Sequence, residues 1–348
     1  MAGKYKELAE VLKQECIAPD IYSMWLQTDK IAEQAVPGQF ISVYSNDGSR
    51  LLPRPISLCE IDKDKKALRI VYRVAGKGTA EFAQCQKGDK LEILGPLGNG
   101  FPMERAEGKK VFLIGGGIGI PPMVELSRQL PGEKIVIAGY RDDKLFLKEE
   151  LERNAVFYAA TEDGSVGTKG NVLDAIRENK LTADVIYACG PTPMLRALKA
   201  YAQEQDIECW ISMEERMACG IGACLACVCQ SKEVDDHSHV HNKRVCKDGP
   251  VFLATEVELS KLGAVVTKGV ANVPWPGNPT PRVAEVYGGM LNAIGLQNPG
   301  IDVFVKRDIP FLKQYDTKIV VNVCGRSTKD YCEVVERLAD EPVDLLEI

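Results

Sequence analysis

The 348-residue sequence lacks several features that would place it in a special class. No apolar run approaches the ~20 residues of a membrane-spanning helix, and the start, Met1–Glu7, lacks the apolar core of a signal peptide. The formal net charge of −6 gives no electrostatic support to a nucleic-acid partner. We therefore expect a cytoplasmic globular protein that binds neither membranes nor nucleic acids.

Histidine is also scarce, and all three histidines lie within Asp236–His241. A Rieske centre would need Cys-x-His pairs, which the sequence lacks, so we interpret this segment as a solvated loop. Adventitious metal binding is the alternative. Cysteine, in contrast, is abundant, and five of the 12 cysteines lie between Cys219 and Cys246. Disulfide frameworks are typical of small secreted domains, so clustered thiols here indicate a metal site.

The spacing of these cysteines predicts an iron–sulfur cluster. Cys219, Cys224 and Cys227 form a C-x4-C-x2-C run, and Cys246 returns from a separate segment. This is the plant-type [2Fe–2S] pattern. A structural zinc is the alternative, but one distant cysteine fits zinc ribbons poorly. Cys229 lies outside the pattern, and we interpret it as a buried packing residue.

The chain before the cysteines divides into two kinds of pattern. Residues up to about 103 show short strand-like runs between tight turns, which predicts an antiparallel β barrel. Residues 108–212 alternate apolar runs with helix-like stretches, which predicts βαβ units and a parallel sheet. The expected domains are residues 1–104, 105–212, a cysteine module at 213–257 and a further α/β segment at 258–348.

Two motifs in the barrel are candidates for a flavin site. In Arg54-Pro55-Ile56-Ser57, the guanidinium suits a pyrophosphate and the hydroxyl suits the flavin ring N5. A plain barrel edge is the alternative. The segment Arg73–Thr79, rich in small residues before a helix start, predicts a phosphate nest.

The parallel sheet carries two further motifs. Gly115, Gly116, Gly117 and Gly119 follow a strand and precede two prolines that open a helix. Glycines let the backbone approach a phosphate, but the run fails the strict G-x-G-x-x-G test. The second motif, Cys189-Gly190-Pro191, ends a later strand of the same sheet, where ligands bind.

In this order, R-P-x-S, G-x-G-T, G-G-G-x-G-x-P-P and C-G-P resemble the ferredoxin–NADP reductase superfamily. With Met213–Cys227 and Arg244–Phe252 added, residues 1–257 resemble the electron-transfer subunits of NAD-dependent (type B) dihydroorotate dehydrogenase. The resemblance implies FAD in the barrel, NAD on the sheet and a [2Fe–2S] cluster on the four cysteines. It implies FAD contacts at Arg54, Pro55, Ile56, Ser57, Val71, Tyr72, Arg73, Gly78 and Thr79.

The same resemblance implies a nicotinamide preference and a partner. The strand Val156–Ala160 runs into Glu162 and Asp163, near the adenosine ribose in this superfamily. A carboxylate there accepts a hydrogen bond from a ribose 2′-OH and repels a 2′-phosphate, which predicts NADH over NADPH. A solvated acidic turn is the alternative. The implied partner is the FMN-containing catalytic subunit of the enzyme, in a heterotetramer of pyrimidine biosynthesis.

The segment 258–348 resembles that catalytic subunit, an FMN-containing (β/α)8 barrel. The similar runs are Gly263–Gly269, Gly277–Arg282, Met290–Gly300 and Val320–Val323. On the resemblance, Lys268 would bind FMN or orotate, and Asn292 with Ile294–Leu296 would bind orotate; vestigial residues are the alternative. A full barrel takes ~250 residues, so we expect a partial barrel from a deletion or a fusion of reading frames, with unpaired strand edges.

The expected function is therefore electron transfer from dihydroorotate-reduced FMN on a partner, through [2Fe–2S] and FAD, to NAD+. One alternative is the small subunit of an NADH-dependent ferredoxin:NADP oxidoreductase or sulfide dehydrogenase, which four cysteine ligands disfavour. A second alternative is a non-enzymatic iron–sulfur carrier disabled by the fusion.

Overall fold

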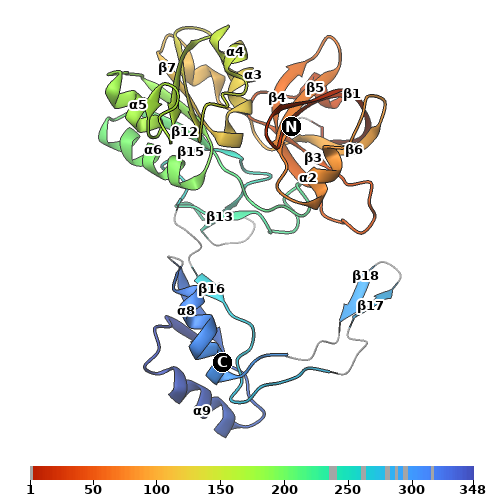
Figure 1. Ribbon diagram of the computed structural model, residues 1–348, viewed down its shortest axis with the longest axis vertical. Coiled ribbons are helices and arrows are strands. Elements are labelled where there is room, and N and C mark those ends of the chain that lie inside the picture. Colours follow the sequence, from red (N-terminus) through yellow and green to blue (C-terminus); the bar gives the residue numbers. More distant parts are fainter. Residues whose placement is uncertain are drawn as a thin grey trace. The chain divides into compact units, whose positions relative to one another are not determined.

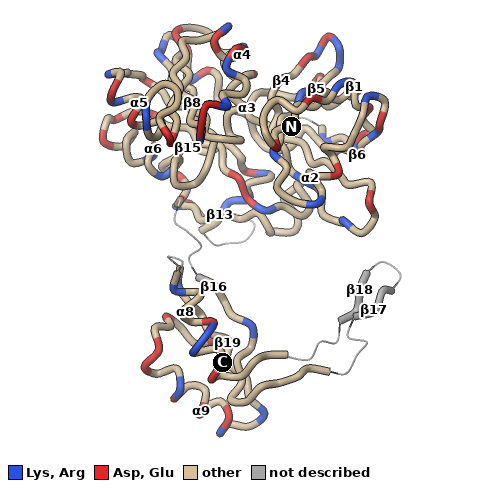
Figure 2. The backbone as a smooth tube through the Cα atoms, in the orientation of Figure 1, with Lys and Arg blue, Asp and Glu red and all other residues tan. Residues whose placement is uncertain are grey.

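The computed structural model describes residues 3–234, 241–259, 264–278, 283–286, 289–292, 297–314 and 317–348. The chain forms two compact units, Met1–Leu259 and Ser260–Ile348 (Figure 1). Figure 2 shows positive and negative residues interspersed along the chain in both units. Within the described ranges, no helix combines the length and apolar character needed to cross a membrane.

A closed antiparallel barrel occupies the N-terminal part of the first unit (Figure 1). Its strands follow one another around the barrel in the order β1, β2, β5, β4, β3 and β6. They span β1 Tyr5–Ala18, β2 Ile21–Gln27, β3 Phe40–Val43, β4 Arg54–Asp62, β5 Ala67–Arg73 and β6 Lys90–Leu97. Two short helices, α1 Ile31–Gln34 and α2 Lys77–Phe82, lie between strands. This confirms the predicted barrel.

A seven-stranded sheet follows the barrel, in the order β10, β9, β8, β7, β11, β12 and β15. The strands are β7 Val111–Gly116, β8 Lys134–Tyr140, β9 Val156–Thr161, β10 Thr168–Lys169, β11 Val185–Cys189, β12 Glu208–Ser212 and β15 Val251–Leu253. All neighbours pair in parallel except β15, which pairs antiparallel with β12. The parallel α/β organisation predicted from the alternating pattern is confirmed.

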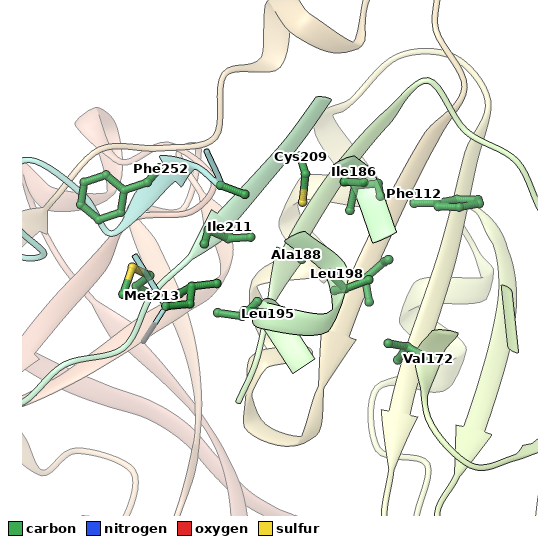
Figure 3. Packing of buried hydrophobic residues seen from close by; sticks show 14 of the residues in the cluster. Phe112, Val172, Ile186, Ala188, Leu195, Leu198, Cys209, Ile211, Met213 and Phe252 are labelled. Carbon is green, nitrogen blue, oxygen red and sulfur yellow. The ribbon is translucent and has the colours of Figure 1, made fainter. Parts of the chain in front are cut away.

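Helices cover both faces of this sheet. The helices are α3 Pro121–Gln129, α4 Lys148–Glu152, α5 Val172–Glu178 and α6 Thr192–Glu204. Figure 3 shows Leu195 and Leu198 of α6 beside Ile186 and Ala188 of β11, and the same core includes Phe112 of β7. Side chains of α3 and α4 pack with the alternate residues of these strands on the opposite face. Burial of both faces explains why these strands read as continuous apolar runs.

The cysteine segment folds against both the barrel and the sheet. It contains a short hairpin, β13 Val228–Gln230 with β14 Asn242–Arg244, before the chain enters β15. Asn99, just after the barrel, donates its backbone N–H to the Gly249 carbonyl at 2.6 Å and its side-chain amide to the Asp248 carbonyl at 3.0 Å. The segment is therefore anchored to the end of the barrel through Asn99 and to the parallel sheet through the pairing of β15 with β12.

The second unit has its own hydrophobic core and a three-stranded parallel sheet in the order β16, β19, β20. The strands are β16 Ala264–Val266, β19 Lys318–Asn322 and β20 Leu345–Glu347. Between them lie the consecutive helical turns α7 Ile301–Val303, η3 Phe304–Asp308 and α8 Ile309–Leu312, and then α9 Thr328–Leu338. A separate hairpin pairs β17 Val283–Val286 with β18 Gly289–Asn292. Parallel strands joined by helices are the arrangement expected of a partial (β/α)8 barrel.

Candidate functional site

A cavity of about 650 Å³ opens on the barrel where strand β4 begins and strand β5 ends, near the cysteine segment. Eight of the nine residues predicted to contact FAD line it: Arg54, Pro55, Ile56, Ser57, Val71, Tyr72, Arg73 and Thr79. The ninth, Gly78, lies directly beneath the Arg54 side chain, whose Nε is 2.7 Å from where a Cβ on Gly78 would be. The structure therefore brings all nine predicted residues to one place.

The loop before α2 is held by the Thr79 hydroxyl. Its Oγ1 accepts the backbone N–H groups of Ala75 at 2.9 Å and Gly76 at 3.2 Å, and it donates to the Gly76 carbonyl at 3.1 Å. These bonds fix the Gly-Lys-Gly-Thr turn beside Arg54. The predicted phosphate-binding turn is thus a rigid local structure at the wall of the cavity.

The cavity also has a wall that the motifs did not predict. The segment after β12 contributes Met213, Glu214, Glu215, Arg216 and Met217. Burial raises the pKa of the Glu214 carboxyl, and Arg73 partly opposes this rise. A chain segment that leaves a distant strand gives no local flavin motif, so its place in this wall follows only from the fold.

A second cavity of about 480 Å³ lies at the carboxyl ends of the parallel strands. Gly116, Gly117, Glu162 and Pro191, all predicted nicotinamide-site residues, line it. Arg73 and Ile118 line both cavities, so the two adjoin. A ligand at the ends of the parallel strands would therefore lie next to a ligand in the barrel cavity, as hydride transfer between two bound groups requires.

The other predicted glycines shape the floor of this second cavity. A Cβ on Gly119 would come within 2.3 Å of the Cys189 carbonyl oxygen, so only glycine fits at this crossing. Gly115 and Gly190 pack equally closely against Ile120 and Met194. Gly115, Gly119 and Gly190 thus allow close backbone packing next to the cavity, and their predicted role in nicotinamide binding, with that of Cys189, stays a prediction.

The two acidic residues after β9 have different surroundings. Glu162 lines the second cavity, whereas Asp163 accepts the Ser165 hydroxyl at 2.6 Å and the Ser165 N–H at 2.9 Å. Those bonds lower the pKa of Asp163. Arg141 and Lys144, which follow β8, also line the cavity and were not predicted. The carboxylate that faces this site therefore has cations in the same cavity.

The four predicted cluster cysteines lie in two close pairs. In one pair the Cys224 backbone N–H donates to the Cys219 Sγ at 3.4 Å, and in the other the Cys246 backbone N–H donates to the Cys227 Sγ at 3.4 Å. Among the described residues, no three His, Cys, Asp or Glu side chains are arranged so that they could hold one metal ion together. Two pairs of thiols fit a two-iron group, because each iron of a [2Fe–2S] cluster takes two thiolates.

Backbone N–H groups converge on these sulfurs. The Cys219 Sγ accepts N–H groups from Ile221 at 3.5 Å, Ala223 at 3.3 Å and Cys224 at 3.4 Å. Burial would raise the pKa of Cys219, but these bonds lower it to about 7. The Cys246 thiol bonds to Cys227 and lowers the pKa of Cys227 to about 6. One cysteine of each pair, Cys219 or Cys227, is therefore favoured as the thiolate that binds iron, whereas the hydrogen bond with Cys227 and burial raise the pKa of Cys246.

Two of the cysteines outside the predicted cluster set, Cys229 and Cys209, are buried and have raised pKa values. All 12 cysteines are free thiols. Burial raises the pKa of Cys229 to about 11 and that of Cys209 to about 12. Asp236–Val240, with two of the three histidines, lies outside the described residues, while His241 contacts the Lys232 carbonyl through Nδ1 at 2.9 Å. The two lowered thiol pKa values, those of Cys219 and Cys227, both belong to the predicted cluster set.

In the second unit, the predicted residues are only partly placed. Lys268 is exposed, two residues after β16. At the end of β19, the Asn322 side chain donates to Glu347 at 2.8 Å, and its backbone N–H donates to Thr267 Oγ1 at 3.3 Å. Asn292 is the last residue of β18, and Ile294–Leu296 lie outside the described residues.

Most of this chain is similar in sequence to known proteins. An electron transfer subunit of dihydroorotate dehydrogenase B (NAD(+)) from Geobacillus sp. (strain WCH70) is 42% identical over 260 residues, which are 73% of this chain and 99% of that protein. The chain belongs to the family of dihydroorotate dehydrogenase B electron transfer subunits. The Fusobacterium nucleatum member is 43% identical over 253 residues, covering 70% of this chain and 95% of that protein.

Family models and solved structures agree with this membership. The iron-sulfur cluster binding domain of dihydroorotate dehydrogenase B matches residues 214–258, and the dihydroorotate dehydrogenase model matches residues 245–348. A chain of the NADH-dependent reduced ferredoxin-NADP oxidoreductase superposes with a TM-score of 0.63 and 26% identity, over 73% of this chain and 90% of that one. The resemblance to both subunits of one enzyme is confirmed.

Proposed function

We propose that this chain is the electron transfer subunit that carries electrons from dihydroorotate-reduced FMN on a partner catalytic subunit, through a [2Fe–2S] cluster and FAD, to NAD+. The observation that carries the proposal is that one compact unit, similar over its length to such subunits, holds two adjoining cavities and two thiol pairs. When bound, FAD exchanges a hydride with a nicotinamide and single electrons with an iron–sulfur cluster.

The barrel residues would hold FAD by charge and shape. Arg54, fixed over Gly78, offers its guanidinium to the pyrophosphate, because charge-assisted bonds to phosphate are strong and directional. Ser57, which lines the same cavity, would offer a hydroxyl to the flavin ring, and Tyr72 would contribute an aromatic side chain to the cavity wall. Arg73, shared by both cavities, would lie where FAD and the nicotinamide meet.

The sheet residues would hold NAD. Gly116 and Gly117 let the dinucleotide backbone approach the strand end, and Glu162 accepts the ribose hydroxyl. Cys219, Cys224, Cys227 and Cys246 would hold the cluster, two thiolates to each iron. We place the protein in the cytoplasm, where thiols stay reduced, because all its cysteines are free.

The partner would dock where the cysteine loop meets solvent. Ile221, Leu225 and Val228 are exposed apolar residues within or next to the C-x4-C-x2-C run. Exposed apolar residues next to a redox group suit a protein surface that must approach within electron-transfer range. We propose that the FMN-containing catalytic subunit covers these three side chains in a heterotetramer.

The small subunit of an NADH-dependent reduced ferredoxin-NADP oxidoreductase is the competing function. Its structural likeness extends over 73% of this chain but with 26% identity, against 42–45% for the dihydroorotate dehydrogenase subunits. The segment matched by the dihydroorotate dehydrogenase model also favours the first function.

The deciding experiment mixes the purified chain with a separately expressed FMN-containing catalytic subunit. We expect NADH to form from dihydroorotate and NAD+ only when both proteins are present. Cys224→Ser should abolish this coupled activity, and Cys229→Ala, the matched change at a cysteine outside the four, should retain it. A chain that reduces dyes with NADH but never supports the coupled reaction would contradict the proposal.

A further inference from the structure

Ser42, in strand β3, has a buried hydroxyl without a hydrogen-bond partner among the described residues. The residue is 0% exposed, and its Oγ is a buried side-chain oxygen for which the described part of the chain provides no hydrogen-bond partner. Buried hydroxyls are hydrogen-bonded in the large majority of cases, because an unpaired one disfavours the folded state. No motif in the sequence singles out this serine.

The pleat of β3 directs Ser42 toward the cysteine segment. Ile41 and Val43 belong to the core inside the barrel, whereas Phe40 packs in the same core as Cys227. Alternate residues of a strand face opposite sides, so Ser42 shares the outward face of Phe40. The hydroxyl therefore points out of the barrel and under the segment that bears the thiols.

The backbone of the cysteine loop lies directly over this hydroxyl. A Cβ placed on Gly220 would be 3.0 Å from the Ser42 Oγ and 3.1 Å from Leu97 Cδ1. Gly220 has φ +67°, a left-handed conformation that favours glycine, so the loop backbone can approach β3 closely at this residue. The loop backbone therefore lies close to β3 at Gly220, the residue next to Cys219.

We propose that the Ser42 hydroxyl donates a hydrogen bond to a sulfur of the [2Fe–2S] group held by Cys219 and its three companions, and so raises its reduction potential. The inference rests on the proposed function. Sulfides and thiolates are acceptors, and a hydroxyl is a donor that can rotate toward them. Hydrogen bonds to cluster sulfur stabilise the more negative, reduced state, which is how they set the potential.

The test is an EPR-monitored redox titration of the full chain with its cofactors bound. Ser42→Ala should move the midpoint of the cluster to lower potential. At a fixed solution potential, the ratio of reduced to oxidised cluster should fall roughly three- to tenfold, where tenfold is 59 mV for one electron. Ser42→Thr keeps the hydroxyl and should stay near the wild-type midpoint.

Two controls keep the inference distinct from general damage. Ser23→Ala removes another buried barrel hydroxyl, which accepts the Arg69 Nε–H at 2.8 Å, and should leave the midpoint unchanged. If Ser42→Ala loses its cluster, Ser42→Val is compared with Ser42→Thr, since these two share a shape and differ in the hydroxyl.

The outcomes separate the two proposals. An equal midpoint in Ser42→Thr and in the variants without a hydroxyl would overturn the role of Ser42 while leaving the cluster in place. Absence of any iron–sulfur signal in the wild-type chain would instead overturn the proposed function.

Discussion

The two units of this chain resemble two subunits of the same enzyme, but they differ in what their residues can do. In the first unit, residues from barrel, sheet and cysteine loop converge on two cavities and two thiol pairs. In the second, the described residues give three parallel strands, with Lys268 exposed near their ends. A (β/α)8 site is assembled from loops after eight strands. Both units thus contain residues of the motifs described above, and in the first unit these residues line two cavities.

The largest expected effect comes from removing one cysteine of the predicted cluster in the first unit. Cys224→Ser should remove the EPR signal of the reduced cluster and reduce dihydroorotate-dependent NAD+ reduction with the partner at least 100-fold. NADH oxidation with an artificial acceptor should persist, because both cavities lie outside the changed pair. Cys229→Ala should preserve the EPR signal; its loss there would assign Cys229 to the cluster.

The second unit offers the converse test. Purified alone, the full chain should contain one FAD and no FMN, and it should oxidise NADH with an acceptor dye but not oxidise dihydroorotate. Lys268→Ala should change neither flavin content nor NADH oxidation, measured by flavin extraction and by steady-state kinetics. Dihydroorotate turnover by the single chain, lost in Lys268→Ala, would show that the second unit has a working site.

The flavin site gives the next largest effect. Arg54→Ala should weaken FAD binding about 10- to 100-fold, since a bond to a charged group contributes roughly 1.5–3 kcal/mol. Flavin fluorescence during dilution measures this loss. Arg153→Ala is the matched control, because Arg153 pairs with Glu149 on the surface and lies outside the residues that line the FAD cavity. Equal FAD retention in the two variants would remove Arg54 from the site.

The nicotinamide preference should give the smallest effect. We expect higher kcat/KM for NADH than for NADPH with a dye acceptor, and a reduced preference in Glu162→Ser combined with Asp163→Arg. The structure sharpens this expectation, because Asp163 is bonded to Ser165 while Glu162 faces the cavity. Asp163→Asn alone should therefore shift the ratio less than Glu162→Ser alone. The reverse order would place Asp163 at the ribose.

Much of this architecture could be predicted from the sequence, because the residue pattern of many segments matches their burial in the folded protein. The runs at Val111–Ile114 and Val185–Ala188 are buried on both faces, so their apolar character marks them as parallel strands. Strand β1 has a weaker local pattern, because its exposed positions include the apolar Leu8 and the alternation of exposed and buried residues is not kept after Val11. Strands β1 and β2 nevertheless take adjacent places in the closed barrel.

The candidate site was predictable only where a motif is local. Arg54–Ser57 and the four cysteines are short runs with chemistry of their own, and the structure brings each set together. Glu214, Arg141 and Ser42 reach the sites through sheet order and strand pleat, which single-sequence patterns do not encode. The bonding of Asp163 to Ser165 likewise depends on turn geometry.

The most direct measurement of the central claim is the metal and sulfide content of the anaerobically purified chain, with its EPR spectrum after reduction. The account predicts two iron and two acid-labile sulfide per chain and the spectrum of a reduced [2Fe–2S] centre. Stoichiometric zinc, with neither iron nor sulfide, would contradict it.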